Sequence, residues 1–445
     1  MQEKHTPRTR DILLIASVIF GMFFGAGNLI FPIQLGQSAG SNWLLATLGF
    51  LVTGTLVPYL AMLAISVTKS ESAYDLAKPV APWFGMALLV LIHLTLGPLV
   101  ATPRTAATGF TMGVAPFLPE SWQGIGMIIF SFIFFALAIL VSVTNSRITD
   151  WVGRYLTPLF LILIIGVIII GLLNPMGDLN QPVASAYQST PFMTGFLDGY
   201  NTLDGVALLA LAVSVVYAVR GLGYRDQAIS STIAKAGLLS IMLEALIYTA
   251  LIVLGVASLT QLKLADNGGI ALMQIIQHYF GTSGSILTGI LVILAVFTTA
   301  VGLLSSFAHD MHLIFNKISY NGWLIISSAG SFLTANLGLT NIIKWSSPLL
   351  MFIYPFVLTL IFLALIQRFF NGAPIVYRLT MLFVAPMALM DGLASAPFAS
   401  SPAIANLVSG YHHLIPFASA GFGWILPALI GFGLSLIIWH FQKRA

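Results

Sequence analysis

Long apolar runs separated by short polar connections organise this chain. The runs are continuous, whereas the strands of a lipid-spanning barrel would alternate apolar and polar side chains. A helix needs about 20 apolar residues to cross a hydrocarbon core of ~30 Å. The pattern therefore predicts an all-α polytopic membrane protein with about twelve transmembrane helices. The predicted helices are 11–35, 43–68, 83–117, 122–143, 151–173, 191–219, 236–260, 284–315, 323–338, 346–367, 376–395 and 418–441.

The composition supports lipid as the solvent of this chain. It has 445 residues, of which 58% are hydrophobic and only 7% are charged, whereas soluble domains contain roughly 25% charged residues. The short connections leave no room for a soluble domain, so we predict a single membrane domain over 1–445. A basic start followed by an apolar stretch is superficially like a signal peptide. The stretch is too long for one and has no small-residue cleavage site, which indicates a retained first helix.

The distribution of lysine and arginine predicts the orientation. Cytoplasmic loops of membrane proteins hold the positive charge. With the N-terminus inside, the inside segments hold fifteen of these residues, the outside segments hold Lys263 and Lys344, and Arg104 lies within a helix. We therefore expect a multi-pass protein of the bacterial cytoplasmic (inner) membrane with both termini in the cytoplasm, and no nucleic-acid partner. The inside residues are Lys4, Arg8, Arg10, Lys69, Lys78, Arg147, Arg154, Arg220, Arg225, Lys235, Lys317, Arg368, Arg378, Lys443 and Arg444.

Several classes of chemistry are poorly supported by the sequence. The chain has no cysteine, which excludes disulfides, thiolate metal sites and cysteine nucleophiles. It contains neither Gly-x-Ser-x-Gly nor His-Glu-x-x-His, so an intramembrane hydrolase is disfavoured. His309, Asp310 and His312 resemble a metal cluster, but no further histidine or cysteine accompanies them. We therefore predict that the protein is not an enzyme and needs no cofactor.

The first helix contains an unusual polar and glycine-rich segment, Gly21-Met22-Phe23-Phe24-Gly25-Ala26-Gly27-Asn28. Each glycine costs a helix interior about 1 kcal/mol, so three together favour an unwound stretch. Unwound backbone at membrane depth is tolerated where it is buried in protein or lines a cavity. Its free N–H groups would suit a carboxylate and its free carbonyls a cation. Close helix packing through the glycines is the alternative.

The sixth helix shows a second polar interruption, from Asp198 to Gly205, in which five of eight side chains are polar. Interrupted helices at matching positions of two halves point to a transporter binding site. The two interrupted helices are five apart, so the halves would be inverted repeats over 11–173 and 191–367, with two accessory helices over 376–441. In the alternative, the helix starts near Leu203 and Asp198 lies in the outside loop.

Three further features are candidates for chemistry inside the membrane. Arg104 is a charge within the third helix, which is costly and suggests either function or pairing with a carboxylate such as Asp204. Glu244 in the seventh helix is either a proton site or a structural carboxyl. In the eighth helix, hydroxyls over 298–306 could ligate a hard cation or bond to their own helix backbone; for the Ser305–Ser306 pair we favour the ion site.

Together these residues resemble a known family. The run Gly25-Ala26-Gly27-Asn28-Leu29-Ile30-Phe31-Pro32, with Pro98 and Pro103-Arg104-Thr105 in helix three and Thr202-Leu203-Asp204 in helix six, is similar to bacterial branched-chain amino-acid carriers, and the resemblance spans essentially the whole chain. It implies a LeuT-like fold of the amino acid–polyamine–cation superfamily, with a 5+5 inverted repeat and two accessory helices. It also implies uptake of leucine, isoleucine and valine with Na⁺ as the coupling ion.

The resemblance also implies roles for individual residues. The implied substrate-binding residues are Gly25, Ala26, Gly27, Asn28, Tyr200, Asn201, Thr202, Asp204 and Arg104. The implied first sodium site is Phe23, Asn28 and Thr202, and the second is Gly21, Phe24, Val301, Ser305 and Ser306. The sequence departs from the wider fold at Leu304, where a hydroxyl often precedes the serine pair, and at the bulky Phe23 and Phe24.

We therefore predict a secondary active symporter that works by alternating access within the lipid bilayer. The alternatives are a proton-coupled carrier of a similar small apolar amino acid, in which Glu244 or Asp204 titrates, a membrane enzyme or receptor, and a channel. The sequence gives no oligomeric state.

Overall fold

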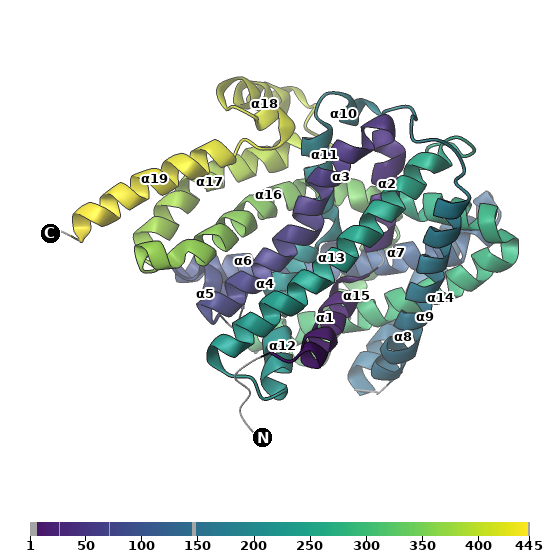
Figure 1. The fold of residues 1–445 in the computed structure, drawn as a ribbon, viewed down its shortest axis with the longest axis horizontal. Helices are drawn as coiled ribbons and strands as arrows, with labels where there is room; N and C mark the ends of the chain where they lie inside the picture. Colours follow the sequence, from purple (N-terminus) through teal and green to yellow (C-terminus); the bar gives the residue numbers. More distant parts are fainter. Residues whose placement is uncertain (1–6, 26, 71, 145–147, 444–445) are drawn as a thin grey trace.

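The structure is a computed structural model that describes residues 7–25, 27–70, 72–144 and 148–443. Within these ranges the chain is nearly all helical and contains no β-strand element. Figure 1 shows long helices that run roughly side by side, with the N-terminus at one edge and the short helices α10 (Ser185–Gln188) and α18 (Pro402–Leu414) at the opposite edge. The all-α prediction is confirmed.

Every predicted helix has a helical counterpart, although several counterparts are interrupted. The first five are α1 (Thr9–Phe23) with α2 (Gly27–Ala39), α3 (Trp43–Leu51) with η2 (Val52–Leu56) and α4 (Val57–Thr68), α6 (Pro82–Leu94) with η3 (Thr95–Leu99) and α7 (Ala101–Gly113), α8 (Glu120–Thr144), and α9 (Ile148–Leu173). The next five are α11 (Pro191–Asp198) with η5 (Gly199–Thr202) and α12 (Asp204–Gly221), α13 (Asp226–Ser258), α14 (Gly268–Ile314), α15 (Tyr320–Ala335), and α16 (Leu339–Ile366). The last two are α17 (Pro374–Ala394) and α19 (Ile425–Gln442).

Several connections between the predicted helices carry α-helical structure, among them α5 (Ala73–Ala77), α10, the start of α14, and α18. Helix α14 begins at Gly268, inside the predicted connection 261–282, because the Asn267 side chain caps its start by accepting from the N–H groups of Gly269 and Ile270. The helix then kinks at Gly281, where φ is +61°, a conformation that glycine adopts without penalty. The predicted connection 396–417 contains α18, which starts with a proline in its first turn.

Length and hydropathy alone give a smaller number of spans than the fold does. Eight helices among the described residues qualify by these criteria, or nine if the bent pair Asp204–Leu211 and Ser214–Gly221 is one span. The difference arises from interruptions and bends. The first span is split into α1 and α2, and the run Gly27–Thr68 joins α2 to the whole second span. Helix α15 has only 16 residues.

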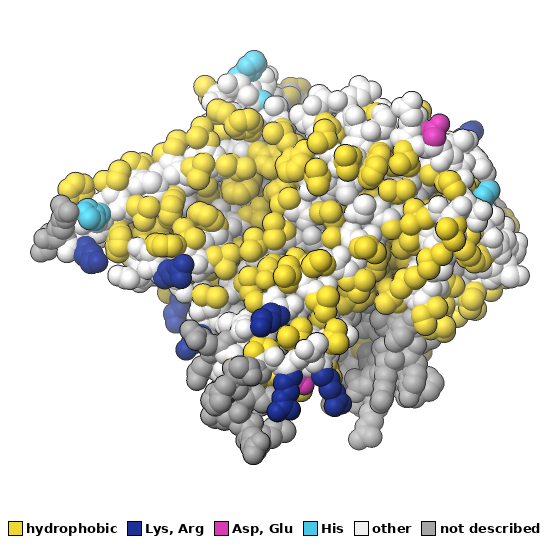
Figure 2. Space-filling model, in the orientation of Figure 1, with side chains coloured by type: hydrophobic (Ala, Val, Ile, Leu, Met, Phe, Trp, Pro, Cys, Tyr) yellow, Lys and Arg dark blue, Asp and Glu magenta, His cyan; other side chains and the backbone are white. Residues whose placement is uncertain are grey.

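The surface carries the polarity expected of a membrane protein. Large apolar side chains on α8, such as Ile125, Phe132 and Leu140, are about half exposed or more. Figure 2 shows hydrophobic side chains over the broad middle of one face, with lysines and arginines gathered along its lower edge, on the side of the N-terminus. A lipid-facing band bounded by charge on one side is what the positive-inside rule requires.

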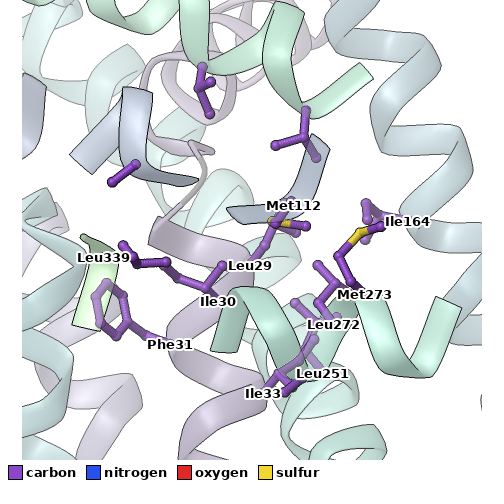
Figure 3. Close-up of a cluster of buried hydrophobic side chains, with 14 of the residues drawn as sticks. Leu29, Ile30, Phe31, Ile33, Met112, Ile164, Leu251, Leu272, Met273 and Leu339 are labelled. Atoms are coloured by element: carbon purple, nitrogen blue, oxygen red, sulfur yellow. The ribbon is translucent and has the colours of Figure 1, made fainter. Parts of the chain in front are cut away.

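Helix α2 forms the centre of the hydrophobic core. Nearly all of its side chains are buried, including the polar Asn28 and Gln37, as expected of a helix enclosed by other helices. It packs along α13 and also contacts α14. Figure 3 shows its side chains among those of the surrounding helices; the labelled residues are Leu29, Ile30, Phe31, Ile33, Met112, Ile164, Leu251, Leu272, Met273 and Leu339. This packing fixes the start of α2 near the middle of the molecule.

Candidate functional site

Three interrupted helices meet at the centre of the molecule. The first span breaks between Phe23 and Gly27, and the sixth breaks at η5, after which Leu203 has a φ of +67°. The third span is broken as well, because Gly97 has a ψ of −117° within η3 and Val100 is not helical. The predicted interruptions of the first and sixth helices are present. The alternative in which helix six starts near Leu203 is wrong, because α11 precedes the break and ends at Asp198.

A cavity of about 100 Å³ lies where these breaks meet. Six of the predicted substrate-binding residues line it: Gly25, Gly27, Asn28, Arg104, Thr202 and Asp204. The other lining residues are mostly apolar: Leu96, Ala101, Thr105, Leu203, Ala207, Leu211, Val296, Thr299 and Leu303. Polar groups and helix ends therefore face a chamber whose remaining walls are largely aliphatic. This arrangement suits a small amphiphilic solute.

Asn28 connects the first span to the sixth and the seventh. Its Nδ2 donates to Asp204 Oδ2 at 2.8 Å, to Glu244 Oε1 at 3.2 Å and to the hydroxyl of Tyr248. Its Oδ1 accepts from the backbone N–H of Gly25 at 3.1 Å. The Tyr248 hydroxyl lies 2.9 Å from Glu244 Oε1 and 3.3 Å from Asp204 Oδ2. Asn28, Asp204, Glu244 and Tyr248 are called the central cluster below.

The central cluster is short of positive charge. Asp204 and Glu244 are 4% and 1% exposed, and both use the same amide and phenol as hydrogen-bond donors. Glu244 Oε2 has no partner among the described residues. Two buried carboxyl groups at one site cannot both be ionised without a compensating charge. A proton or a small cation at the cluster would compensate this charge.

Arg104 is held by a backbone carbonyl and an aromatic ring. It is 7% exposed, its Nη1 donates to the carbonyl of Asn201 at 2.7 Å, and its guanidinium lies 5.0 Å from the centre of the Phe31 ring. Asp204 is near enough to interact with it electrostatically. Arg104 therefore ties the third span to the break in the sixth, and it adds positive charge beside Gly27.

The predicted residues of η5 divide between two faces of that segment. Thr202 faces the central cavity, with its hydroxyl 3.0 Å from the carbonyl of Gly199. Tyr200 and Asn201 instead line a second cavity, of about 480 Å³. The Tyr200 ring stacks on the ring of Tyr354 with centroids 3.8 Å apart. Tyr200 and Asn201 are predicted substrate-binding residues, and the structure places them at this second cavity and not at the central one.

The residues of the predicted second sodium site are spread over α1 and α14. Gly21 is exposed, with open space where a side chain would point, and α1 packs mainly against α13 and α12. Phe24 and Val301 are buried, while Ser305 and Ser306 are half-buried. This site stays a prediction.

Other predicted features have individual outcomes. Ala26 lies outside the described residues, as does the side chain of Phe23. Thr298 and Thr299 both donate to the carbonyl of Ala295, which is the backbone-bonding alternative.

Asp310 and His312, near the end of α14, have separate partners. Asp310 lies 3.0 Å from His93 of α6, and His312 Nδ1 lies 2.7 Å from the carbonyl of Ile318. Among the described residues, no group of three histidines or acids is arranged to hold a metal ion.

Sequence reasoning missed two features of the site. It did not predict the break in the third span, although Gly97-Pro98 is a helix-breaking pair. It also missed Tyr248, which a signal could have found. Residues four apart share one face of a helix, so Tyr248 had to lie beside Glu244.

Helices broken at membrane depth around a small polar and apolar cavity define a polytopic transporter of the LeuT-like class. The fold comparison agrees. Mhp1, a nucleobase-cation-symport-1 family transporter in a closed conformation with bromovinylhydantoin bound, matches with a TM-score of 0.57 at 13% identity, covering 100% of this chain and 96% of that one. MhsT in complex with L-phenylalanine matches with a TM-score of 0.58 at 16% identity, covering 89% and 100%.

Sequence comparison identifies the family. Residues 8–442 match the family described as branched-chain amino acid transport protein, so the chain belongs to this family. It is 37% identical to the branched-chain amino acid permease BrnQ of Lactobacillus delbrueckii subsp. lactis, covering 100% of both chains. It is 38% identical to BrnQ of Bacillus subtilis, covering 94% of each, and 31% identical to BrnQ of Escherichia coli K12, covering 97% and 96%. These relatives are named as permeases, not enzymes.

Proposed function

We propose that this protein imports branched-chain amino acids (leucine, isoleucine and valine) together with Na⁺ by alternating access. The observation that carries the proposal is the central cavity, in which broken helix ends and two members of the central cluster, Asn28 and Asp204, face aliphatic walls. The names of the relatives support the same substrate class.

The start of α2 is the proposed carboxylate site. Its first N–H groups have no partner within the helix, and the helix dipole is positive at this end. Gly27 and Asn28 begin α2 and line the cavity, and Arg104 adds positive charge beside them. Leu96, Leu211 and Leu303 then provide the apolar surface for the side chain. Because one methylene in such a pocket discriminates by only ~1–3 kcal/mol, all three substrates should be accepted.

The central cluster is the proposed site of the coupling ion. Asp204 and Glu244 offer hard oxygen ligands, which Na⁺ prefers to softer donors, and the oxygens of Asn28 and Thr202 lie at the same cavity. One Na⁺ that crosses about 100 mV releases roughly 2.3 kcal/mol. A tenfold Na⁺ gradient adds about 1.4 kcal/mol. Together these terms allow roughly several-hundred-fold accumulation.

Proton coupling is the second candidate, and one observation favours it. Among the described residues, Glu244 Oε2 is buried without a partner next to a second carboxyl group, so a proton could serve in place of the cation.

We also propose that the N-terminal edge faces the cytoplasm, because lysines and arginines gather there (Figure 2). Import then runs from the edge that carries α10 and α18.

Leucine uptake into proteoliposomes tests this proposal. We expect wild-type protein to accumulate radiolabelled leucine when an inward Na⁺ gradient is imposed. Asn28→Ala should abolish accumulation, because it removes the amide that joins three helices. Asn341→Ala, which removes an exposed amide that donates to the carbonyl of Leu337 just before α16, is the matched control and should behave as wild type. Accumulation driven by a pH gradient alone would replace Na⁺ with H⁺, and equal uptake in every condition would reject symport.

A further inference from the structure

A further pocket, of about 480 Å³, lies at the connection between α14 and α15, away from the two cavities described above. Its lining residues are Ile314, Phe315, Asn316, Lys317, Ile318 and Trp323. Lys317 belongs to the residues that the positive-inside rule assigns to the cytoplasm. In the proposed orientation this pocket therefore meets the inner leaflet of the bilayer, and it is called the inner pocket below.

The inner pocket carries a positive charge and no negative one. Lys317 is exposed, and none of the other described lining residues is acidic. The acid nearest to Lys317 along the chain is Asp310, and its Oδ2 already lies 3.0 Å from His93 Nε2. The charge of the pocket therefore favours an anion.

Trp323 adds a hydrogen-bond donor that lacks an acceptor. Its Nε1 is buried and has no partner among the described residues, and an indole N–H can only donate. Leaving such a group without an acceptor is costly. Because Trp323 and Lys317 line the same pocket, the fitting ligand is one that brings both a negative charge and acceptor oxygens.

The surroundings of the inner pocket face lipid. Leu313 and Phe315, at the end of α14, are 69% and 45% exposed, and Ile325, near the start of α15, is 58% exposed. Helix α15 has 16 residues and therefore spans about 24 Å, which is less than the ~30 Å of a hydrocarbon core. Lipid headgroups must therefore approach the ends of α15, and the inner pocket lies at one of them.

A phosphate that is attached to acyl chains has all of these properties. Its oxygens pair with the charge of Lys317 and accept from the indole of Trp323, while the acyl chains cover the exposed apolar side chains nearby. An ethanolamine headgroup would add an ammonium group, for which the pocket has no acid. We propose that the inner pocket binds the headgroup phosphate of an anionic phospholipid, such as phosphatidylglycerol, in the inner leaflet. The choice of leaflet rests on the proposed function.

A chain of ring contacts connects the inner pocket to the break in the third span. The rings of Trp323 and Phe307 meet edge to face, with centroids 6.0 Å apart. Phe307 packs against Gly97, where an added Cβ would lie 2.6 Å from Cδ2 of its ring. Gly97 follows Leu96, which lines the central cavity. A lipid that holds Trp323 in place therefore also supports this break, and it should speed up transport.

Native mass spectrometry of the detergent-purified full-length protein tests the site. We expect wild type to bind phosphatidylglycerol more tightly than phosphatidylethanolamine. Lys317→Gln should weaken phosphatidylglycerol binding about fivefold. Trp323→Phe keeps a ring beside Phe307 but removes the N–H group, and it should weaken the binding as well. Lys344→Gln, at an exposed position on the predicted outer side, is the matched control and should bind as wild type does.

Three results of the binding measurement would overturn the lipid site. The first is equal affinity of wild type for the two lipids, and the second is unchanged phosphatidylglycerol binding in both Lys317→Gln and Trp323→Phe. The third is displacement of the lipid by inorganic phosphate at a similar concentration, which would identify a site for free phosphate.

Leucine uptake tests the effect on transport. Wild type should transport faster in vesicles of phosphatidylcholine with phosphatidylglycerol than in phosphatidylcholine alone, whereas Lys317→Gln should respond much less. Wild-type uptake that is independent of phosphatidylglycerol would overturn the link to the third span. Uptake without any phosphatidylglycerol binding refutes only the inner pocket, whereas phosphatidylglycerol binding without uptake in either vesicle refutes the proposed function and leaves the lipid site in place.

Discussion

A single amide determines the geometry of the central cluster. Asn28 donates to groups on α12 and α13 and accepts from the unwound backbone at Gly25. A shorter side chain could not bridge these helices, and a charged one would upset the balance with the two carboxyl groups. In the proposed mechanism, Asn28 couples the ion site to the substrate site through direct hydrogen bonds, which is the basic requirement for symport.

Glu244→Gln should weaken ion binding without changing the shape of the site. Glutamine has the size of glutamate and keeps an oxygen that can accept from Tyr248, but it removes one charge. A hydrogen bond or contact to a charged group is worth about 1.5–3 kcal/mol, so we expect the apparent Na⁺ affinity of leucine uptake to fall about ten- to a hundredfold. Glu120→Gln, at an exposed position on α8, is the control. An unchanged Na⁺ dependence would show that Glu244 does not belong to the proposed ion site.

Gly27→Ala should impair uptake more than stability. A Cβ at Gly27 would lie 3.0 Å from Nη2 of Arg104, so the guanidinium must shift by a few tenths of an ångström beside the proposed carboxylate site. Overpacking of this kind costs about 1–3 kcal/mol, and we expect leucine transport to fall about five- to a hundredfold at normal expression. Gly166→Ala, with open space around it, should match wild type. Normal transport by Gly27→Ala would show that Arg104 need not stay in place.

The sequence was most informative where unusual residues interrupt an apolar run. Gly25, Asn28, Thr202 and Asp204 were all selected this way, and all line the central cavity. Tyr200 was selected with them, but it lines the second cavity, on the other side of η5. The polar run in helix six shows that a break occurs, whereas the direction of each side chain depends on the path of the unwound backbone, which composition does not encode.

At the scale of elements, close helix packing holds α2 in place. Gly36 of α2 faces the carbonyl of Ile252, and Gly255 of α13 faces the carbonyl of Ile33. A side chain at either glycine would collide with the backbone of the other helix. Helices in membranes associate through such small residues, because the surrounding lipid gives no hydrophobic drive. Close helix packing through glycines, the alternative considered for the first helix, therefore applies to Gly36 and Gly255, which lie outside the break.

Gly255→Ala should therefore destabilise the folded protein. The added methyl group forces α2 and α13 apart, at a cost of about 1–3 kcal/mol, and we expect a lower midpoint in thermal unfolding of the detergent-purified protein. Gly433→Ala lies on α19 with open space around it and should leave the midpoint unchanged. Equal midpoints for the two variants would contradict a close contact between α2 and α13.

Helix existence was predictable from the sequence, but helix continuity was not. Runs of apolar residues located every span, because lipid requires them. Gly97-Pro98 lies within such a run and gave no polar signal, so the break in the third span was missed. Likewise, the arm of α14 before Gly281 depends on the Asn267 cap and on a left-handed glycine, and hydropathy does not register either feature.

At the scale of the whole molecule, the two cavities lie on the two sides of one helix break. The second cavity is lined from α10, α18 and the segment 418–421 at the edge opposite the N-terminus, and the central cavity lies beyond η5 (Figure 1). Lysines and arginines gather at the N-terminal edge (Figure 2). In the proposed orientation that edge faces the cytoplasm, so a substrate reaches the second cavity from outside and the cation moves down its gradient in the same direction.

Single introduced cysteines measure this orientation directly, because the chain has none of its own. Ser189 is exposed in the connection after α10, and Asn316 is exposed between α14 and α15. Three spans separate the two positions, so they must lie on opposite sides of the membrane. We expect a membrane-impermeant maleimide to modify Ser189→Cys in intact cells and Asn316→Cys only after permeabilisation. The reverse pattern would show the opposite orientation and place the second cavity on the cytoplasmic side, where it could not receive substrate for import.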